Sequence, residues 1–232
     1  MTLELCIESI EEARLAQALG IPRVELCSAL DLHGLSPSGG AIFECCKLSG
    51  LEIHVMIRPR AGDFCYTKHE IAVMETNIYL AGRMGVHGVV FGMLDKNNNL
   101  DTESAKQLLD LAKESHLEVT FHRAFDLVND PLSCLDQLIG LGFDRVLSSG
   151  QKPTAPEGIH LIKMLVERAA GRIQIMAGAG IHANNALNFK KLGVDAIHFT
   201  ARKAIPINSG LDMGMNYEPD IKKLSDLVQL FQ

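Results

Sequence analysis

Eight short apolar runs alternate with eight helical stretches along this chain, and this alternation constrains the fold more than any other feature. Strands are predicted at Leu3–Ile7, Arg23–Cys27, Glu52–Arg58, Gly88–Gly92, Glu118–His122, Asp144–Ser149, Arg172–Gly178 and Asp195–Thr200. Helices are predicted at Ser9–Leu19, Ser38–Leu48, Thr67–Met84, Thr102–Ser115, Pro131–Leu141, Glu157–Ala169, Ala183–Leu192 and Ile221–Phe231. Repeated strand–helix units produce parallel strands joined by crossover helices. We therefore predict an α/β fold, a TIM-like (β/α)8 barrel; the strand count and even spacing favour it over an open doubly wound sheet.

The 232 residues are expected to form a single domain, 1–232. A barrel of about 250 residues is a usual single domain, and no linker divides the sequence. Hydrophobic residues make up 47% of the chain, which excludes a disordered or collagen-like protein. An irregular segment is expected at about 206–220, before the C-terminal helix, and is a candidate cover for one end of the barrel.

Charge and hydropathy exclude two classes of partner. The net charge is −6 and there is no block of basic residues, so nucleic acid is not expected as the main partner. No run approaches the roughly 18 apolar residues of a membrane span. The N-terminal stretch is acidic and lacks the features of a signal peptide, so we expect a cytoplasmic protein with its six cysteines as thiols.

Polar residues follow the predicted strands densely, at the end where barrel enzymes carry their chemistry. Glu25 and Cys27 share one strand face, and Arg58 on the neighbouring strand is the expected partner of Glu25. Two interpretations remain open: a buried ion pair that fixes the barrel register, or an acid/base or substrate-binding role for Glu25.

A second cluster follows the fifth strand. His122 is a candidate general acid or base, Arg123 a candidate anion ligand, and Asp126 a candidate for catalysis or for orienting the other two. Arg58 is a further candidate anion ligand, with Asp63 in the following loop. Helix capping and surface salt bridges are the alternative interpretation of these residues.

A glycine-rich turn follows the seventh strand. Gly178 and Gly180 allow backbone N–H groups to approach an anion, and in many barrels the loops after strands seven and eight bind phosphate. Residues 200–202 would be the second part of such a site. A simple tight turn is the alternative.

Cys6 and Cys27 end adjacent strands. Two thiolates so placed could hold a soft ion such as Cu(I). Two buried apolar thiols are the alternative.

Six motifs resemble those of the CutC family, known as copper homeostasis proteins: RVELCSAL, HGLSPS, VMIRPRAGDFCY, VTFHRAFD, RVLSSGQ and IMAGAGI. The match runs from Leu3 to about Ala201. The resemblance implies a TIM-like barrel, a cytoplasmic location, homodimers or higher homo-oligomers, and intracellular copper handling with Cu(I) bound at Cys6 and Cys27. The HGLSPS and SSG segments depart mildly from the usual pattern of the family, and the resemblance fades after Arg202.

These residues and the resemblance lead to two hypotheses for the function. The first is a Cu(I)-binding protein. The second is a metal-independent enzyme acting on a small phosphorylated or carboxylated metabolite, with His122 as acid/base, Glu25 as a second carboxylate and an anion clamp of Arg58 and Arg123. In that hypothesis Asp63 and Asp126 orient the arginines. A barrel whose polar strand ends are purely structural is a third possibility, and the first two require the strand-end residues to converge at one opening.

Overall fold

The structure, a computed structural model, describes residues 1–205 and 214–232. Eight parallel strands close into a barrel in chain order: β1 (Thr2–Ile7), β2 (Arg23–Leu26), β3 (Glu52–Met56), β4 (Gly88–Phe91), β5 (Glu118–Phe121), β6 (Arg145–Ser148), β7 (Gln174–Gly178) and β8 (Ala196–Phe199). The ring closes where β1 pairs with β8, with Leu3 opposite Ile197. The predicted TIM-like barrel is confirmed, and an open sheet is excluded.

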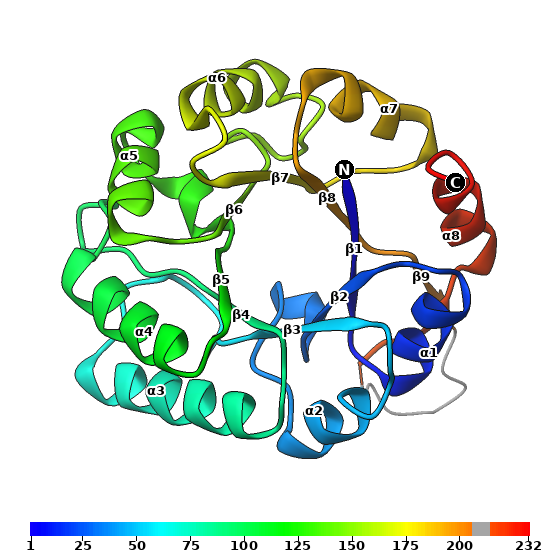
Figure 1. Ribbon diagram of the computed structural model, residues 1–232, viewed down its shortest axis with the longest axis horizontal. Helices are drawn as coiled ribbons and strands as arrows, with labels where there is room; N and C mark the ends of the chain where they lie inside the picture. The colour runs from blue at the N-terminus through cyan, green and yellow to red at the C-terminus, as the bar shows by residue number, and fades with distance from the viewer. Residues whose placement is uncertain (206–213) are drawn as a thin grey trace.

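Helices surround the strands on the outside (Figure 1). They are α1 (Ile10–Ala18), α2 (Gly39–Cys45), α3 (Lys68–Arg83), α4 (Thr102–Glu114), α5 (Pro131–Leu141), α6 (Ile159–Ala169), α7 (Ala183–Leu192) and α8 (Ile221–Val228). Two short 3-10 helices, η1 (Leu30–Leu32) and η2 (Arg123–Leu127), follow β2 and β5. Local sequence explains where α1 begins, because Ser9 and Glu12 form a capping box there.

Side chains alternate in direction along the strands, which gives one apolar core between the barrel and the helices and another inside the barrel. Outward-facing apolar residues such as Val24, Val89 and Ile175 pack against the helices in one large cluster. Inward-facing residues form a smaller apolar cluster of Cys6, Cys27, Met56 and Val90, and a second one of Leu147, Met176 and Ala196. The barrel interior also carries buried charged and polar side chains, which are Glu4, Arg23, Glu25, His54, Thr120 and Arg145.

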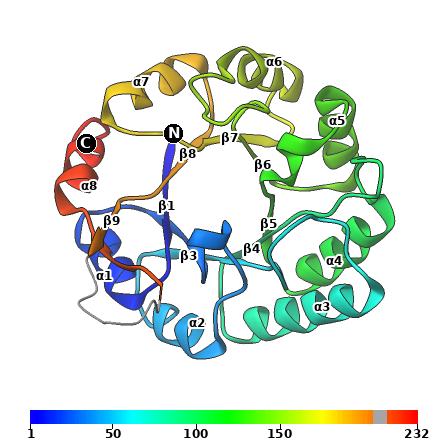
Figure 2. The same ribbon diagram turned by 180° about the vertical axis from the view of Figure 1, so that it is seen from behind.

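A two-stranded antiparallel sheet follows the barrel. It pairs β9 (Arg202–Ile205) with β10 (Asn216–Pro219). The expectation of an irregular segment over 206–220 is therefore wrong for 216–219, and residues 206–213 lie outside the described part of the chain. Arg202 forms ion pairs with Glu8 after β1 and Asp31 in η1, which fixes β9 beside the loops at the barrel mouth. Figures 1 and 2 both place β9 between α1 and α8.

Among the described residues, no helix is both long enough and apolar enough to cross a membrane.

Candidate functional site

A cavity of about 560 Å³ opens at the carboxyl ends of the strands. Its walls include these predicted site residues: Cys6, Glu25, Cys27, Arg58, His122, Arg123, Asp126 and Gly180. Glu25, Arg58 and His122 come from three separate strand ends, and they converge on this one opening as predicted. Asp63 and Gly178 are not among the residues that line it.

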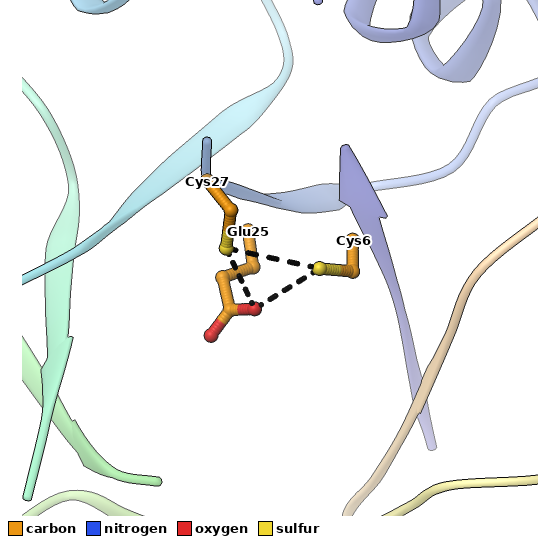
Figure 3. Close-up of side chains that lie close together, drawn as sticks. All are labelled: Cys6, Glu25 and Cys27. Carbon is orange, nitrogen blue, oxygen red and sulfur yellow. Dashed lines mark hydrogen bonds between the residues drawn. The ribbon is translucent and has the colours of Figure 1, made fainter. Parts of the chain in front are cut away.

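Cys6, Glu25 and Cys27 form a thiol–carboxyl cluster on one wall of the cavity. Their side chains point toward one another from β1, from β2 and from the residue after β2 (Figure 3). Oε2 of Glu25 lies 3.2 Å from Sγ of Cys6 and 3.4 Å from Sγ of Cys27, and the two sulfur atoms are 3.8 Å apart. All three residues are buried, and their donor atoms are close enough together to surround one metal ion.

His198 on β8 extends this cluster. Its Nδ1 lies 2.8 Å from Oε1 of Glu4, and its Nε2 lies 3.7 Å from Oε2 of Glu25. Glu4 is fully buried and also pairs with Arg23 at 2.5 Å. The sequence interpretation placed His198 on its strand but gave it no role. The missing signal was the register of β8 against β1, which places His198 opposite Glu4.

The pKa values of the ionisable groups in this cluster are shifted in different directions. Hydrogen bonding to Cys27 lowers the pKa of Cys6 to about 6, whereas the same bond and burial raise the pKa of Cys27 well above its usual 9.0. Burial, together with the charge on Cys6, raises the pKa of Glu25 well above 4.5. Burial opposes ionisation of His198, but Glu25, Cys6 and Glu4 outweigh it and raise the pKa of that ring. These shifts favour negative charge on Cys6 and disfavour it on Glu25 and Cys27.

The opposite wall carries His122, which follows β5. Its Nδ1 accepts a hydrogen bond of 3.2 Å from the backbone N–H of Ala124, and its ring packs against Phe64 at 4.8 Å between centroids. Burial, then the charges of Arg58 and Arg123, lower its pKa to about 3. The neutral ring therefore carries its proton on Nε2, which has no partner among the described residues. As placed, His122 is a hydrogen-bond donor near neutral pH, whereas the sequence predicted a general acid or base.

Asp126 holds Arg123 in place. Its Oδ2 accepts from Nε of Arg123 at 2.8 Å, while its oxygens also accept from Ser148, Ser149 and Gln151. With both oxygens occupied, Asp126 orients Arg123, as predicted, and offers no free oxygen for catalysis. Arg123 also donates to Ser149 Oγ at 2.9 Å through Nη2.

Arg58 is buried and serves mainly to join two loops. Its Nη1 donates to the carbonyl of Leu32 at 2.9 Å and to that of Gly34 at 3.1 Å, and its Nη2 donates to Gly62 at 2.9 Å. The predicted pairing with Glu25 is wrong, because β3 ends at Met56 and Arg58 already belongs to the loop. Only Nε of Arg58 is buried without a partner in the described chain.

Asp63 does not orient Arg58. It pairs instead with Arg60 at 2.9 Å, on the exposed side of the same loop. The turn after β7 does reach the cavity, through Ala179, Gly180 and Ile181. Gly178 has a packing role, because a Cβ there would lie 2.6 Å from Leu147 Cδ1.

The fold and the cavity together define a (β/α)8-barrel protein with a polar site of small-molecule size at the end where barrel enzymes carry their chemistry. The CutC family model matches residues 1–203, and the chain belongs to the CutC family.

Curated relatives and a solved structure agree with this. The family protein CutC of Histophilus somni is 44% identical over 96% of this chain and 93% of its own length. The family protein CutC of Pasteurella multocida is 44% identical over 96% of this chain and 92% of its own length. The crystal structure of the CutC protein of Streptococcus agalactiae, a proposed copper homeostasis protein, has a TM-score of 0.80 at 39% identity and covers 85% of this chain and 97% of its own.

Proposed function

We propose that the chain is an enzyme that acts on a small anionic metabolite in the barrel-mouth cavity, without a metal. The volume of about 560 Å³ falls within the range of small-molecule sites. The observation that carries the proposal is a set of three buried polar atoms on cavity-lining residues that have no partner among the described residues: Glu25 Oε1, Arg58 Nε and His122 Nε2. An unpaired buried polar group costs about 1–3 kcal/mol, and an oxygen-rich ligand would relieve that cost.

Each residue then has a distinct role. Glu25, whose raised pKa favours the protonated carboxyl group, supplies a proton to the substrate. His122 donates a neutral hydrogen bond to an oxygen that gains negative charge. Arg123, held by Asp126, binds the anionic group, and Arg58 contributes a fixed positive charge to the wall. This set suits proton transfer next to a carbonyl or loss of an oxygen leaving group.

A ligand-stabilisation screen of metabolites against the metal-free protein tests the proposal. We expect an anionic compound to raise the melting temperature of the wild type, because binding to the folded state alone stabilises it. The shift should shrink in Glu25→Gln, which keeps the shape of the side chain but cannot supply the proton, and turnover should be lost. If no compound stabilises the wild type more than it stabilises His122→Asn, the proposal fails.

Cu(I) binding is the second candidate. It is favoured by the two sulfur atoms at 3.8 Å and by the pKa of about 6 for Cys6, because the thiolate is the metal ligand. Metal–sulfur bonds of about 2.3 Å, as zinc makes, would let one ion bridge such a pair in a bent geometry. Glu25 is the adjacent oxygen donor, although Cu(I) prefers sulfur.

Competition titration against a Cu(I) indicator decides this candidate. The double variant Cys6→Ala/Cys27→Ala should lose one tight site, whereas Cys45→Ala/Cys134→Ala, which removes two other buried free thiols, should keep it. Unchanged stoichiometry and affinity in the first variant would exclude the cluster as the copper site.

We also propose that the protein works in the reducing cytoplasm as a homodimer or higher homo-oligomer. Light scattering coupled to size exclusion measures the oligomeric state.

A further inference from the structure

We infer that the side of the cavity between β6 and β8 binds the phosphate group of a phosphate monoester, on residues 179–181 and between Arg123 and Lys223. This inference rests on the proposed enzymatic function and narrows its substrate to phosphorylated compounds. It also assigns a role to Lys223, which the sequence interpretation left without one.

The turn after β7 lines the cavity and carries backbone N–H groups that have no acceptor among the described residues. Ala179 and Gly180 are consecutive residues with positive φ, 75° and 72°, and with Ile181 they line the cavity. Their carbonyls are already engaged: Ala179 accepts from the N–H of Ala155 at 2.9 Å, and Gly180 accepts from Asn185 Nδ2 at 2.8 Å. The described residues provide no hydrogen-bond acceptor for the N–H groups of Gly180 and Ile181. Successive N–H groups in such a turn form an anion-binding concavity.

Two cations flank this turn. Arg123 reaches toward the loop after β6, where it bonds Ser149, and its Nη1 has no partner in the described chain. Lys223 on α8 lines the cavity together with Thr200 after β8, and its Nζ makes no ion pair with any described residue. Because β7 lies between β6 and β8 in the ring, residues 179–181 lie between the loop after β6, which Arg123 contacts at Ser149, and the end of β8, where Thr200 lines the cavity.

No free carboxylate on the cavity wall, within the described chain, opposes an anion there. Asp126 is saturated by Arg123 and by the loop after β6, and Glu25 lies on the wall formed by β1 and β2, where it contacts Cys6 and Cys27. Three unpartnered buried atoms of other cavity-lining residues, Glu25 Oε1, Arg58 Nε and His122 Nε2, belong to other walls of the same cavity. They are therefore available to the polar groups on the rest of a ligand whose phosphate is bound at residues 179–181.

The donor set favours phosphate over carboxylate. A phosphate monoester offers three terminal oxygens and a charge between about −1.5 and −2 near neutral pH. Three kinds of donor meet here, namely backbone N–H groups, a guanidinium and an ammonium. A planar carboxylate has only two oxygen atoms to accept from them.

Titration calorimetry on the chelator-treated wild type, with inorganic phosphate and then glycerol phosphate as probes, tests the inference. We expect saturable binding in both cases, above the effect of sodium chloride at equal ionic strength. Lys223→Gln should weaken the affinity about tenfold, because a charge-assisted hydrogen bond is lost. Lys222→Gln, with the same charge change on the same helix but outside the cavity lining, should leave affinity within about twofold.

Two outcomes overturn the inference: no saturable phosphate binding, or equal weakening in the Lys222 and Lys223 variants, which would indicate nonspecific charge attraction. Both variants alter exposed side chains, so loss of folding should not obscure the result. The failure of the phosphate site can be distinguished from the failure of the proposed function. If a carboxylate stabilises the wild type in a Glu25-dependent way while phosphate does not bind, the enzyme proposal stands and the phosphate site is wrong.

Discussion

Replacing His122 with asparagine should flatten the acid dependence of stability. The Oδ1 atom of the new side chain can still accept from the N–H of Ala124, but the titrating ring is gone. The folded-state pKa of His122 is about 3, against 6.5 for an unperturbed histidine, so the unfolded state binds more protons between these values. Stability contributed by the neutral ring is therefore full above pH 6.5 and is lost as the pH falls toward 3.

The expected size follows from about 1.36 kcal/mol per pKa unit. Between about pH 6.5 and 4.5, His122 should cost the wild type about 2 kcal/mol of unfolding free energy that His122→Asn does not lose. Urea unfolding followed by circular dichroism measures this, since the chain has no tryptophan. His116→Asn, at an exposed position with φ of 58°, is the matched control. Parallel free-energy curves for wild type and His122→Asn would refute the buried neutral ring.

Three further predictions concern the barrel interior. Glu4→Gln should lower the unfolding free energy by about 3–5 kcal/mol in urea titrations, because its buried partner arginine on β2 is left with only a half-exposed glutamate 4.0 Å away as counter-charge; a loss below about 1 kcal/mol would contradict this. Gly88→Ala should cost about 1–3 kcal/mol, since its Cβ would lie 2.6 Å from the ring of His54, and an unchanged melting temperature would refute that contact. Iodoacetamide at about pH 7.5 should label Cys6 before Cys134, because their pKa values are about 6 and about 12; peptide mass spectrometry showing the reverse order would contradict the assignment.

Strand periodicity predicts the barrel and one wall of its site correctly. Glu25 and Cys27 share a face because side chains alternate along β2, and Cys6 meets them because adjacent parallel strands end together. These are local regularities, so the sequence alone reveals them. The convergence of His122 on the same opening follows from ring closure, which the count of eight strands already predicts.

Side chains beyond the strand ends could not be predicted in this way. Arg58 lies two residues past β3, where the loop carbonyls of Leu32 and Gly34 decide its direction. The protonation state of His122 depends on burial by residues distant in sequence, and the position of His198 opposite Glu4 depends on the register between the first and last barrel strands. Tertiary packing alone determines these features.

The most direct test of a small-molecule site is a crystal structure of the protein purified without added ligand or chelator, with anomalous data at the copper edge. The proposed function predicts electron density for a small organic anion that contacts Arg123 and extends toward Glu25, with its charged group at residues 179–181. An anomalous copper peak between Cys6 and Cys27, in a cavity otherwise filled only by solvent, would contradict it and favour the copper-binding alternative.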